Sequence, residues 1–163
     1  MNRKFKFFKA KKKDSKFLFN LYNSGVLKGF FKNKKKISLN HHETWFNKVL
    51  SEKKNFIFIC TKGNAKIGYI KYEIITKKTS SISIIFKENF RKNYISSYFL
   101  QKTLIYLRKY SEIVKVYAEV LKSNKRSQKF FSNNNFTLIR KSKLMNSNFD
   151  KKNLVYYFKN EKK

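Results

Sequence analysis

Three observations predict that this chain of 163 residues folds as an α+β domain with a mixed, mostly antiparallel central sheet flanked by helices. Short apolar or alternating runs, typical of strands, occur between longer segments whose apolar residues recur with helical spacing. Three of the strand-like runs follow one another with only tight turns between them, as antiparallel strands do. Neither a repeat nor a linker interrupts the pattern, so we expect one domain over residues 1–163.

The N-terminal part is predicted to form one strand and one helix. Phe and Lys alternate in residues 3–8, which indicates a short strand with one buried face. Asp14 and Ser15 can cap a helix whose apolar residues recur at helical spacing. The Asn-Ser-Gly sequence at residues 23–25 is a stop signal, and we expect this helix to end there.

A second helix is predicted to begin between Ser38 and Asn40. Asn40 and Glu43 have the spacing of a capping pair, in which each side chain bonds the backbone near the other. The apolar side of this helix carries Trp45 and Phe46. Two helices therefore follow the first strand.

The later elements follow in a regular order. The predicted meander consists of strands at residues 55–61, 65–75 and 80–86. After it come a helix at 95–110, a strand at 114–121, a short helix from Asn124, and strands at 136–139 and 154–158. The predicted element order is β-α-α-β-β-β-α-β-α-β-β.

The short helix near the C-terminal end carries a specific spacing of polar and aromatic residues. Asn124 and Ser127 offer capping groups at its start, and Phe131 lies on its inner side. Asn135 stands where a left-handed residue is expected after the helix, because Asn tolerates positive φ nearly as well as Gly. The spacing from Asn124 to Phe136 resembles the closing signature of the GNAT acyltransferase superfamily, Asn-x-x-Ser/Ala-x-x-x-Tyr/Phe-x-x-x-Gly-Phe, with Asn135 in place of the Gly.

The predicted element order is also similar to the GNAT order. Three stretches resemble the amino-sugar N-acetyltransferases of pseudaminic and legionaminic acid biosynthesis: the helix pattern at residues 14–23, the helix pattern at 37–46, and the strand Lys66–Tyr72. The resemblance implies an enzyme that moves an acetyl group from acetyl-CoA to a primary amine, foremost that of a nucleotide-linked amino sugar. It implies no metal.

The cofactor loop departs from the family pattern. The family sequence Arg-Gly-x-Gly-x-Gly offers backbone N–H groups and a helix N-terminus to the pyrophosphate of coenzyme A. The corresponding loop here begins at Arg91 and contains no Gly, so its charge, hydroxyl groups and helix dipole must supply the binding. The residues that the resemblance places at the cofactor are Ile84, Ile85, Phe86, Arg91, Lys92, Asn93, Tyr94, Ser96, Ser97, Asn124, Ser127 and Phe131.

The resemblance also implies how catalysis proceeds. The strand at residues 80–86 and the strand at 114–121 would splay apart, and the backbone N–H of Ile84 or Ile85 would polarise the thioester carbonyl. Many GNAT enzymes carry a Tyr where this chain has Phe131, to protonate the leaving thiolate. Phe cannot donate a proton, so water would take that role.

Three residues are candidates for the base that removes the amine proton: His42, Glu73 and Glu119. His42 belongs to a His-x-x-Trp pattern, and a histidine suits proton transfer near neutral pH. The alternative for His42 is a capping or packing role, and for the two carboxylates an outward position among lysines. Trp45 and Phe46 either pack in the core or offer an aromatic platform to a pyranose ring.

Composition limits the classes of function. Forty Lys and Arg against nine Asp and Glu give a formal charge of +31, but these basic residues are spread along the whole chain. We interpret most of this charge as solvated surface and expect nonspecific, salt-dependent contact with polyanions. The high content of hydrophobic residues, 41%, excludes a disordered polycation, and no RNA-recognition or zinc-finger motif is present.

A single cysteine, Cys60, lies in an apolar run and is predicted to be a buried strand residue. With no partner for a disulfide, it favours a reducing compartment, and we expect a cytoplasmic protein with no signal peptide and no membrane span. Three functions remain in competition. They are acetylation of an amino sugar, acetylation of a protein or peptide terminus, and nucleic-acid binding by an inactive GNAT fold.

Overall fold

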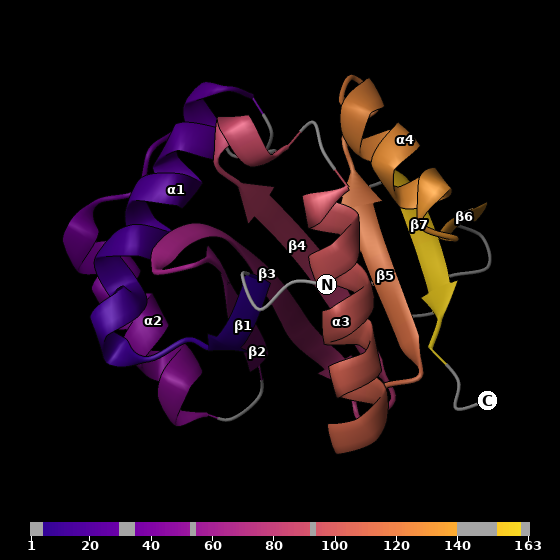
Figure 1. Ribbon diagram of the computed structural model, residues 1–163, viewed down its shortest axis with the longest axis horizontal. Coiled ribbons are helices and arrows are strands. Elements are labelled where there is room, and N and C mark those ends of the chain that lie inside the picture. The colour runs from indigo at the N-terminus through magenta and orange to yellow at the C-terminus, as the bar shows by residue number, and fades with distance from the viewer. Residues whose placement is uncertain (1–4, 30–34, 53–54, 92–93, 140–152, 161–163) are drawn as a thin grey trace. The chain divides into compact units, whose positions relative to one another are not determined.

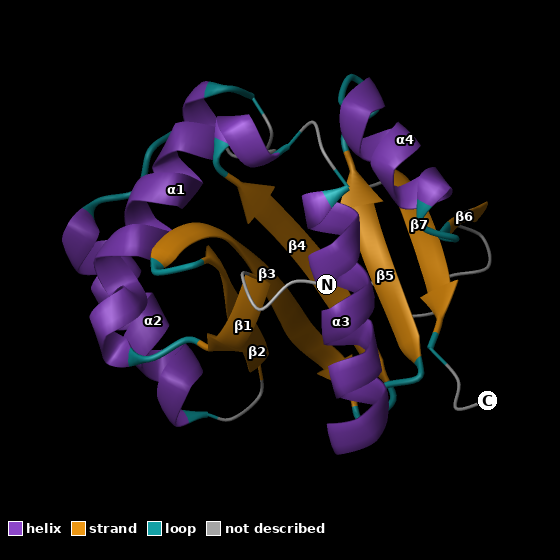
Figure 2. Cartoon of the chain, in the orientation of Figure 1, coloured by secondary structure: helices purple, strands orange, loops and turns teal. Residues whose placement is uncertain are grey.

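The computed structural model describes residues 5–29, 35–52, 55–91, 94–139 and 153–160 (Figure 1). Within those residues the helices and strands follow one another in the predicted order, with two short 3₁₀ turns added (Figure 2). The elements are β1 (Phe5–Lys9), α1 (Ser15–Leu27), α2 (Leu39–Ser51), β2 (Asn55–Lys62), β3 (Ala65–Thr76), β4 (Thr79–Phe86), α3 (Ile95–Tyr110), β5 (Lys115–Val120), α4 (Lys125–Asn133), β6 (Thr137–Ile139) and β7 (Leu154–Lys159).

One sheet contains all of these strands. Hydrogen bonds join them in the order β1-β2-β3-β4-β5-β7-β6. The pairs β1–β2, β2–β3, β5–β7 and β6–β7 are antiparallel. The β4–β5 pair is parallel, with Thr79–Ser81 opposite Lys115–Tyr117. The α+β fold with a mixed, mostly antiparallel sheet is therefore confirmed.

The chain divides into two compact units. The first comprises Met1–Glu73 and Ser83–Thr103, and the second comprises Ile74–Ile82 and Leu104–Lys163. Elements β3, β4 and α3 contribute residues to both. The expectation of one domain over residues 1–163 stays a prediction, as does the splaying of β4 from β5.

In the first unit, the alternation of side chains along the strands separates two apolar layers. Tyr69 of β3 and Ile59 of β2 face a core that includes Leu18 and Leu21 of α1 and Phe46 of α2. The intervening strand residues face α3: the Tyr72 hydroxyl lies 2.8 Å from Thr103 Oγ1, and the Phe86 and Phe99 rings are 5.8 Å apart. Thus α1 and α2 pack on one face of this part of the sheet and α3 on the other.

Helix α1 departs from the prediction at both ends. Asp14 makes no side-chain cap to it; its carboxylate is fully buried, accepts from the Lys11 N–H at 2.8 Å and pairs with Lys66 Nζ at 2.6 Å. The predicted stop at residues 23–25 is also wrong, because the helix continues to Leu27 and Gly29 follows it with a φ of +68°. A Gly in the left-handed region ends helices without steric cost.

Asn23 explains why the helix passes the stop signal. Its side-chain amide donates to the Ile37 carbonyl at 3.1 Å, and its side-chain oxygen accepts from the Ile37 N–H at 3.0 Å. These two bonds satisfy a buried polar side chain within a helix, so it does not compete for its own backbone. They also attach Ile37, the residue before the N-cap of α2, to α1.

Helix α2 begins as predicted but with a different cap. Ser38 is its N-cap residue, and the Ser38 hydroxyl accepts from the His41 N–H at 3.2 Å. The predicted Asn40–Glu43 capping pair is therefore wrong, because both residues lie inside the helix. Ser38 reaches the third helical residue, which is the usual geometry of a serine cap.

The second unit confirms the predicted signature of the short helix. Asn124 caps α4 by accepting from the Ser127 N–H at 3.0 Å, and Asn135 has a φ of +65°. Phe131 is buried, with its ring 5.0 Å from that of Phe136 and 6.3 Å from that of Tyr156. The turn after α4 therefore directs the chain into β6 by the geometry that the spacing predicts.

Gly68 allows an unusually close approach of β3 to β4 within the first unit. A Cβ at Gly68 would lie 2.7 Å from the Ile85 carbonyl oxygen and 2.4 Å from the Phe86 ring. The β2–β3 register shifts at this place, where Cys60 is opposite Gly68 and Thr61 is opposite Lys66. The bulge and the missing side chain together fix the part of β4 that is expected to hold the thioester.

We expect Gly68→Ala to destabilise the protein by about 1–3 kcal/mol, because the added methyl group must displace backbone of β4. The check is urea denaturation followed by circular dichroism. A Phe86→Leu change in the same chain relieves the ring contact but leaves the carbonyl contact, so it should restore only part of the loss. A Gly68→Ala midpoint equal to that of the unmutated protein would contradict the close approach.

Candidate active site

The first unit contains a cavity of about 320 Å³ beside α1 and α2. Helices α1 and α2 and the segment between them supply more than half of its lining, and strands β2, β3 and β4 supply the rest. The lining residues are Leu18, Tyr22, Ile37, His41, His42, Trp45, Ile57, Tyr69, Lys71 and Ser83. Aromatic surface combined with a few polar groups is typical of sites for small molecules.

Local geometry brings these side chains to one place. On β3, Tyr69 and Lys71 are two residues apart and so point to the same face of the sheet. On α2, His41 and Trp45 are four residues apart and lie on one side of the helix, next to His42.

His42 is the candidate base that lines the cavity. Its ring is buried, stacks on Phe46 with centroids 5.8 Å apart, and lies 5.6 Å from the Trp45 ring. His42 Nε2 lies 3.0 Å from the Ser15 carbonyl oxygen. A carbonyl can only accept, so Nε2 carries hydrogen, and in the neutral ring Nδ1 carries the lone pair.

Burial lowers the pKa of His42 below its usual value, and this effect exceeds the opposing effects of the Ser15 hydrogen bond and the Glu43 charge. The ring is thus kept neutral at neutral pH, which a proton acceptor requires. The predicted packing role and the predicted base are compatible in this geometry. Nε2 bonds α2 to the first residue of α1, and Nδ1 carries the lone pair that can accept a proton.

Glu73, the second candidate base, is absent from the cavity lining. It is largely exposed, and its Oε2 lies 2.8 Å from Lys71 Nζ. Lys71 does line the cavity, and its Nζ also lies 5.3 Å from the centroid of the Trp45 ring. Glu73 therefore contacts a residue of the cavity lining but does not itself border the cavity.

Glu119, the third candidate base, belongs to the second unit. It lies on β5 with its side chain exposed, and its Oε1 accepts from the Asn153 side chain at 2.8 Å. The structure thus places the three candidates in three different settings. Within the first unit, His42 lines the cavity and Glu73 does not.

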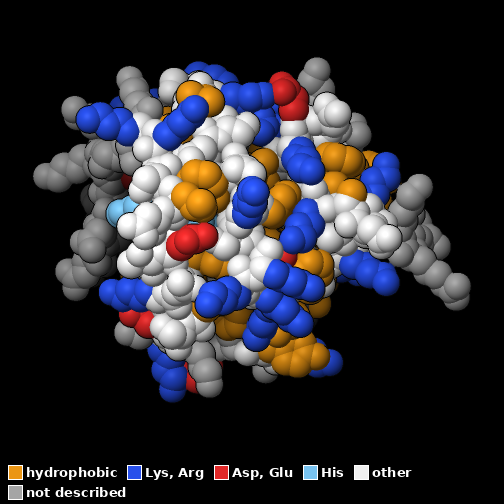
Figure 3. All heavy atoms as spheres, turned by 90° about the vertical axis from the view of Figure 1, so that its left-hand side faces the viewer, with side chains coloured by type: hydrophobic (Ala, Val, Ile, Leu, Met, Phe, Trp, Pro, Cys, Tyr) orange, Lys and Arg blue, Asp and Glu red, His pale blue; other side chains and the backbone are white. Residues whose placement is uncertain are grey.

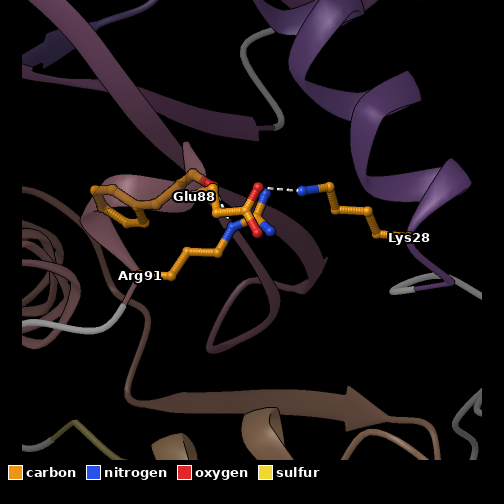
Figure 4. A network of polar contacts seen from close by, with 4 residues as sticks. Lys28, Glu88 and Arg91 are labelled. Carbon is orange, nitrogen blue, oxygen red and sulfur yellow. Dashed lines mark hydrogen bonds and ion pairs between the residues drawn. The ribbon is translucent and has the colours of Figure 1, made fainter.

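The residues expected at the acetyl-CoA thioester lie where β4 ends, in the first unit. Ile85 and Phe86 are buried and Ile84 is half-buried. Arg91 follows the short 3₁₀ turn Glu88–Phe90, and its Nε donates to the Phe86 carbonyl oxygen at 2.5 Å. Figure 4 shows Lys28 and Arg91 both pointing toward the Glu88 carboxylate, with Lys28 Nζ 2.5 Å from Glu88 Oε2.

The residues after Arg91 lead into α3. Lys92 and Asn93 lie outside the described residues, so their role in cofactor binding stays a prediction. Tyr94 is exposed, whereas Ser96 is buried and Ser97 half-buried in the first turn of α3. A cationic side chain beside the start of a 16-residue helix fits an anionic pyrophosphate.

The other expected cofactor residues, Asn124, Ser127 and Phe131, lie in the second unit on α4 and its cap. There Asn124 and Ser127 form the helix cap, and Phe131 packs among aromatic rings. Their part in cofactor binding stays a prediction.

Three further features concern the described part of the chain: metal ligands, the cysteine and the apolar character of the helices. Within it, no group of three or more His, Cys, Asp and Glu is placed to hold a metal ion. Cys60 is buried in β2 as predicted, and burial strongly raises the pKa of its thiol, away from the thiolate that a nucleophile needs. None of the described helices combines the length and apolar character of a membrane span.

The sequence prediction missed two residues of this region, Lys71 and Asn23. Lys71 has a signal in the sequence, because it is the one charged residue within the apolar strand segment Ile67–Tyr72. Asn23 was predicted to be part of a helix stop. Its real partner is 14 residues further along the chain, which local patterns cannot show.

We expect His42 to titrate below the ordinary histidine pKa of about 6.5, in line with its burial. The measurement is an NMR titration of the ring protons in a His41→Gln variant, where His42 is the only imidazole left. The lowered pKa means that the unfolded chain binds the proton more readily. Stability should fall as pH drops from about 6.5, and by less in His42→Gln, whereas a His42 pKa at or above 6.5 would contradict this.

Comparisons with known proteins agree with the geometry. The sequence matches the model of the acetyltransferase (GNAT) domain family over residues 8–153. No curated protein sequence matches this chain. Similar solved structures include an N-acetyltransferase from Staphylococcus aureus, which shares 18% identity at a TM-score of 0.76, with 96% of this chain and 99% of that chain covered.

Two further structures carry ligands. The spermidine N-acetyltransferase of Vibrio cholerae, in complex with CoA and spermine, shares 15% identity at a TM-score of 0.80, covering 98% of this chain and 97% of that one. The microcin C7 self-immunity acetyltransferase, in complex with acetyl-CoA and AMP, shares 16% identity at a TM-score of 0.74, covering 97% and 93%. The family match spans most of this chain, which therefore belongs to the GNAT family and is an acyl-CoA-dependent N-acetyltransferase.

Proposed function

We propose that this enzyme acetylates the primary amine of an amino sugar, foremost one linked to a nucleotide, and that the cavity beside α1 and α2 holds the sugar. The observation that carries the proposal is the lining of this cavity. The partly exposed ring of Trp45 borders it together with His42 and Lys71. An aromatic face suits the apolar side of a pyranose ring, and the polar groups suit its hydroxyl and amino substituents.

The size of the cavity supports a small acceptor. A volume of about 320 Å³ is near the lower end of the range for ligand sites, roughly 300–1,000 Å³. It suits one sugar ring, with a nucleotide extending outside. The sequence patterns at residues 14–23 and 37–46, which supply α1 and α2, are also those that resemble amino-sugar acetyltransferases.

The surface charge agrees with a phosphorylated acceptor. On the face that includes α1 and α2, Lys and Arg side chains are dispersed among apolar and neutral groups, with few Asp and Glu (Figure 3). Such a surface attracts phosphates in solution and raises the rate at which they meet the enzyme. A protein terminus remains a second candidate, and nonspecific contact with polyanions follows from the same charge.

Acetyl-CoA, when bound, supplies the acetyl group as a reactive thioester. The backbone N–H of Ile84 or Ile85 would polarise its carbonyl, and Arg91, with the start of α3, would bind the pyrophosphate. His42 Nδ1 would take the proton from the attacking amine, since His42 is the candidate base that lines the cavity. Phe131 has no hydroxyl, so water would protonate the thiolate.

The test is coenzyme A release with a panel of amino-sugar nucleotides against a panel of peptides with free N-termini. We expect turnover with the sugars, and a loss of roughly 10²–10⁴-fold in His42→Gln, as is usual for a general base. That loss should shrink as pH rises and more amine is neutral. Turnover confined to the peptides would contradict the proposed acceptor.

The Glu73→Gln variant distinguishes between His42 and Glu73, the two candidate bases in the first unit. If His42 is the base, this variant should keep kcat within about twofold, because Glu73 contacts Lys71 and not the cavity. An equal fall in kcat for every acceptor would instead assign the proton transfer to Glu73. The absence of any turnover, together with tight, salt-sensitive RNA binding, would favour an inactive GNAT fold that binds nucleic acid.

A further inference from the structure

We propose that Lys71 is a specificity-determining residue, which selects acceptors that carry an anionic group and disfavours polyamines. The inference rests on the proposed function, because it takes the cavity beside α1 and α2 as the acceptor site. The inference adds the residue whose charge interacts with the charged group of the acceptor. It also gives Glu73 a role other than that of a base.

The position of Lys71 is unusual for a lysine. It lies in β3 between the fully buried Ile70 and Tyr72, and its side chain is 21% exposed. Among the described residues that line the cavity, it is the one with a permanent charge at neutral pH, since the others are apolar, hydroxyl or imidazole side chains. A charge held against apolar surface acts more strongly than one in open water.

Two contacts hold the ammonium group of Lys71 in place. Nζ lies 2.8 Å from Glu73 Oε2 and 5.3 Å from the centroid of the Trp45 ring. A lysine has three N–H donors, and the Glu73 carboxylate accepts one of them. Donors therefore remain for a phosphate or carboxylate of the acceptor. Because Nζ lies beside the Trp45 ring, a sugar that stacks on this ring would have its anionic group near the ammonium group.

The same charge opposes cationic ligands. A polyamine would bring several positive charges to a cavity that already holds an ammonium group, and like charges repel in a partly desolvated site. For an amino sugar, Lys71 favours the neutral form of the amine, because a nearby cation lowers an amine pKa. The neutral amine is the form that attacks the thioester.

Glu73 is in this view a positioning residue. It orients Lys71 from the exposed end of the pair and partly offsets its charge. Removing the negative charge in Glu73→Gln should lower KM for anionic acceptors while kcat is kept. If Glu73 served only the stability of β3, Glu73→Gln would not change KM or kcat for anionic acceptors more than for other acceptors.

The experiment compares kcat/KM for three amines: glucosamine 6-phosphate, glucosamine and spermidine. In the unmutated enzyme we expect the phosphate to be preferred over glucosamine by roughly tenfold or more, and spermidine to be the poorest acceptor. Lys71→Met should remove most of that preference, because it should raise KM for the phosphate much more than for glucosamine. Lys71→Arg should restore the preference. Lys71→Glu should raise activity with spermidine.

Lys16 provides the matched controls, because it is exposed on α1 and lies outside the cavity lining. Lys16→Glu carries the same change of charge as Lys71→Glu, and Lys16→Met the same as Lys71→Met. An equal loss of the preference for the phosphate in Lys16→Met, or equal effects of Lys71→Met on all three amines, would overturn the role of Lys71. If the unmutated enzyme acetylates glucosamine and its phosphate equally well, this inference fails but the proposed function stands. No turnover with either sugar or with the panel of amino-sugar nucleotides, or turnover with spermidine alone, overturns both.

Discussion

The arrangement of the first unit depends on β3, where four consecutive residues make contacts of different kinds. Gly68 lets the backbone of β4 approach so closely that any side chain would meet the Ile85 carbonyl. Tyr69 and Lys71 point to the cavity, while Ile70 between them is fully buried. One strand therefore sets both the position of Ile84–Phe86, expected at the thioester, and a wall of the cavity that we propose as the acceptor site.

Most of the fold follows from local signals in the sequence. The meander, the capping by Asn124 and the left-handed Asn135 depend on residues close together in the chain, so spacing alone predicts them. The ends of α1 do not follow in this way. Asn23 is bonded to Ile37, and Asp14 to Lys66, so distant partners decide what their side chains do.

The same limit applies to the candidate site. The His-x-x-Trp pattern predicted a special role for His42, but only the folded chain shows that Nε2 meets Ser15 and that burial keeps the ring neutral. Glu73 was singled out as a carboxylate on a strand that faces the acceptor, whereas the folded chain places its neighbour Lys71 in the cavity. The missing glycines after Arg91 remain the main departure from the family, and the nearby Lys28 adds positive charge around Glu88.

Trp45 gives a direct test of the central claim that the cavity binds the acceptor. It is the one tryptophan of the chain and lines that cavity, so its fluorescence reports on occupation of the site. Titration with glucosamine 6-phosphate, which does not absorb near 280 nm, should give a saturable change with a midpoint close to KM. Turnover of that acceptor without any change in Trp45 emission would place the acceptor elsewhere and contradict the account.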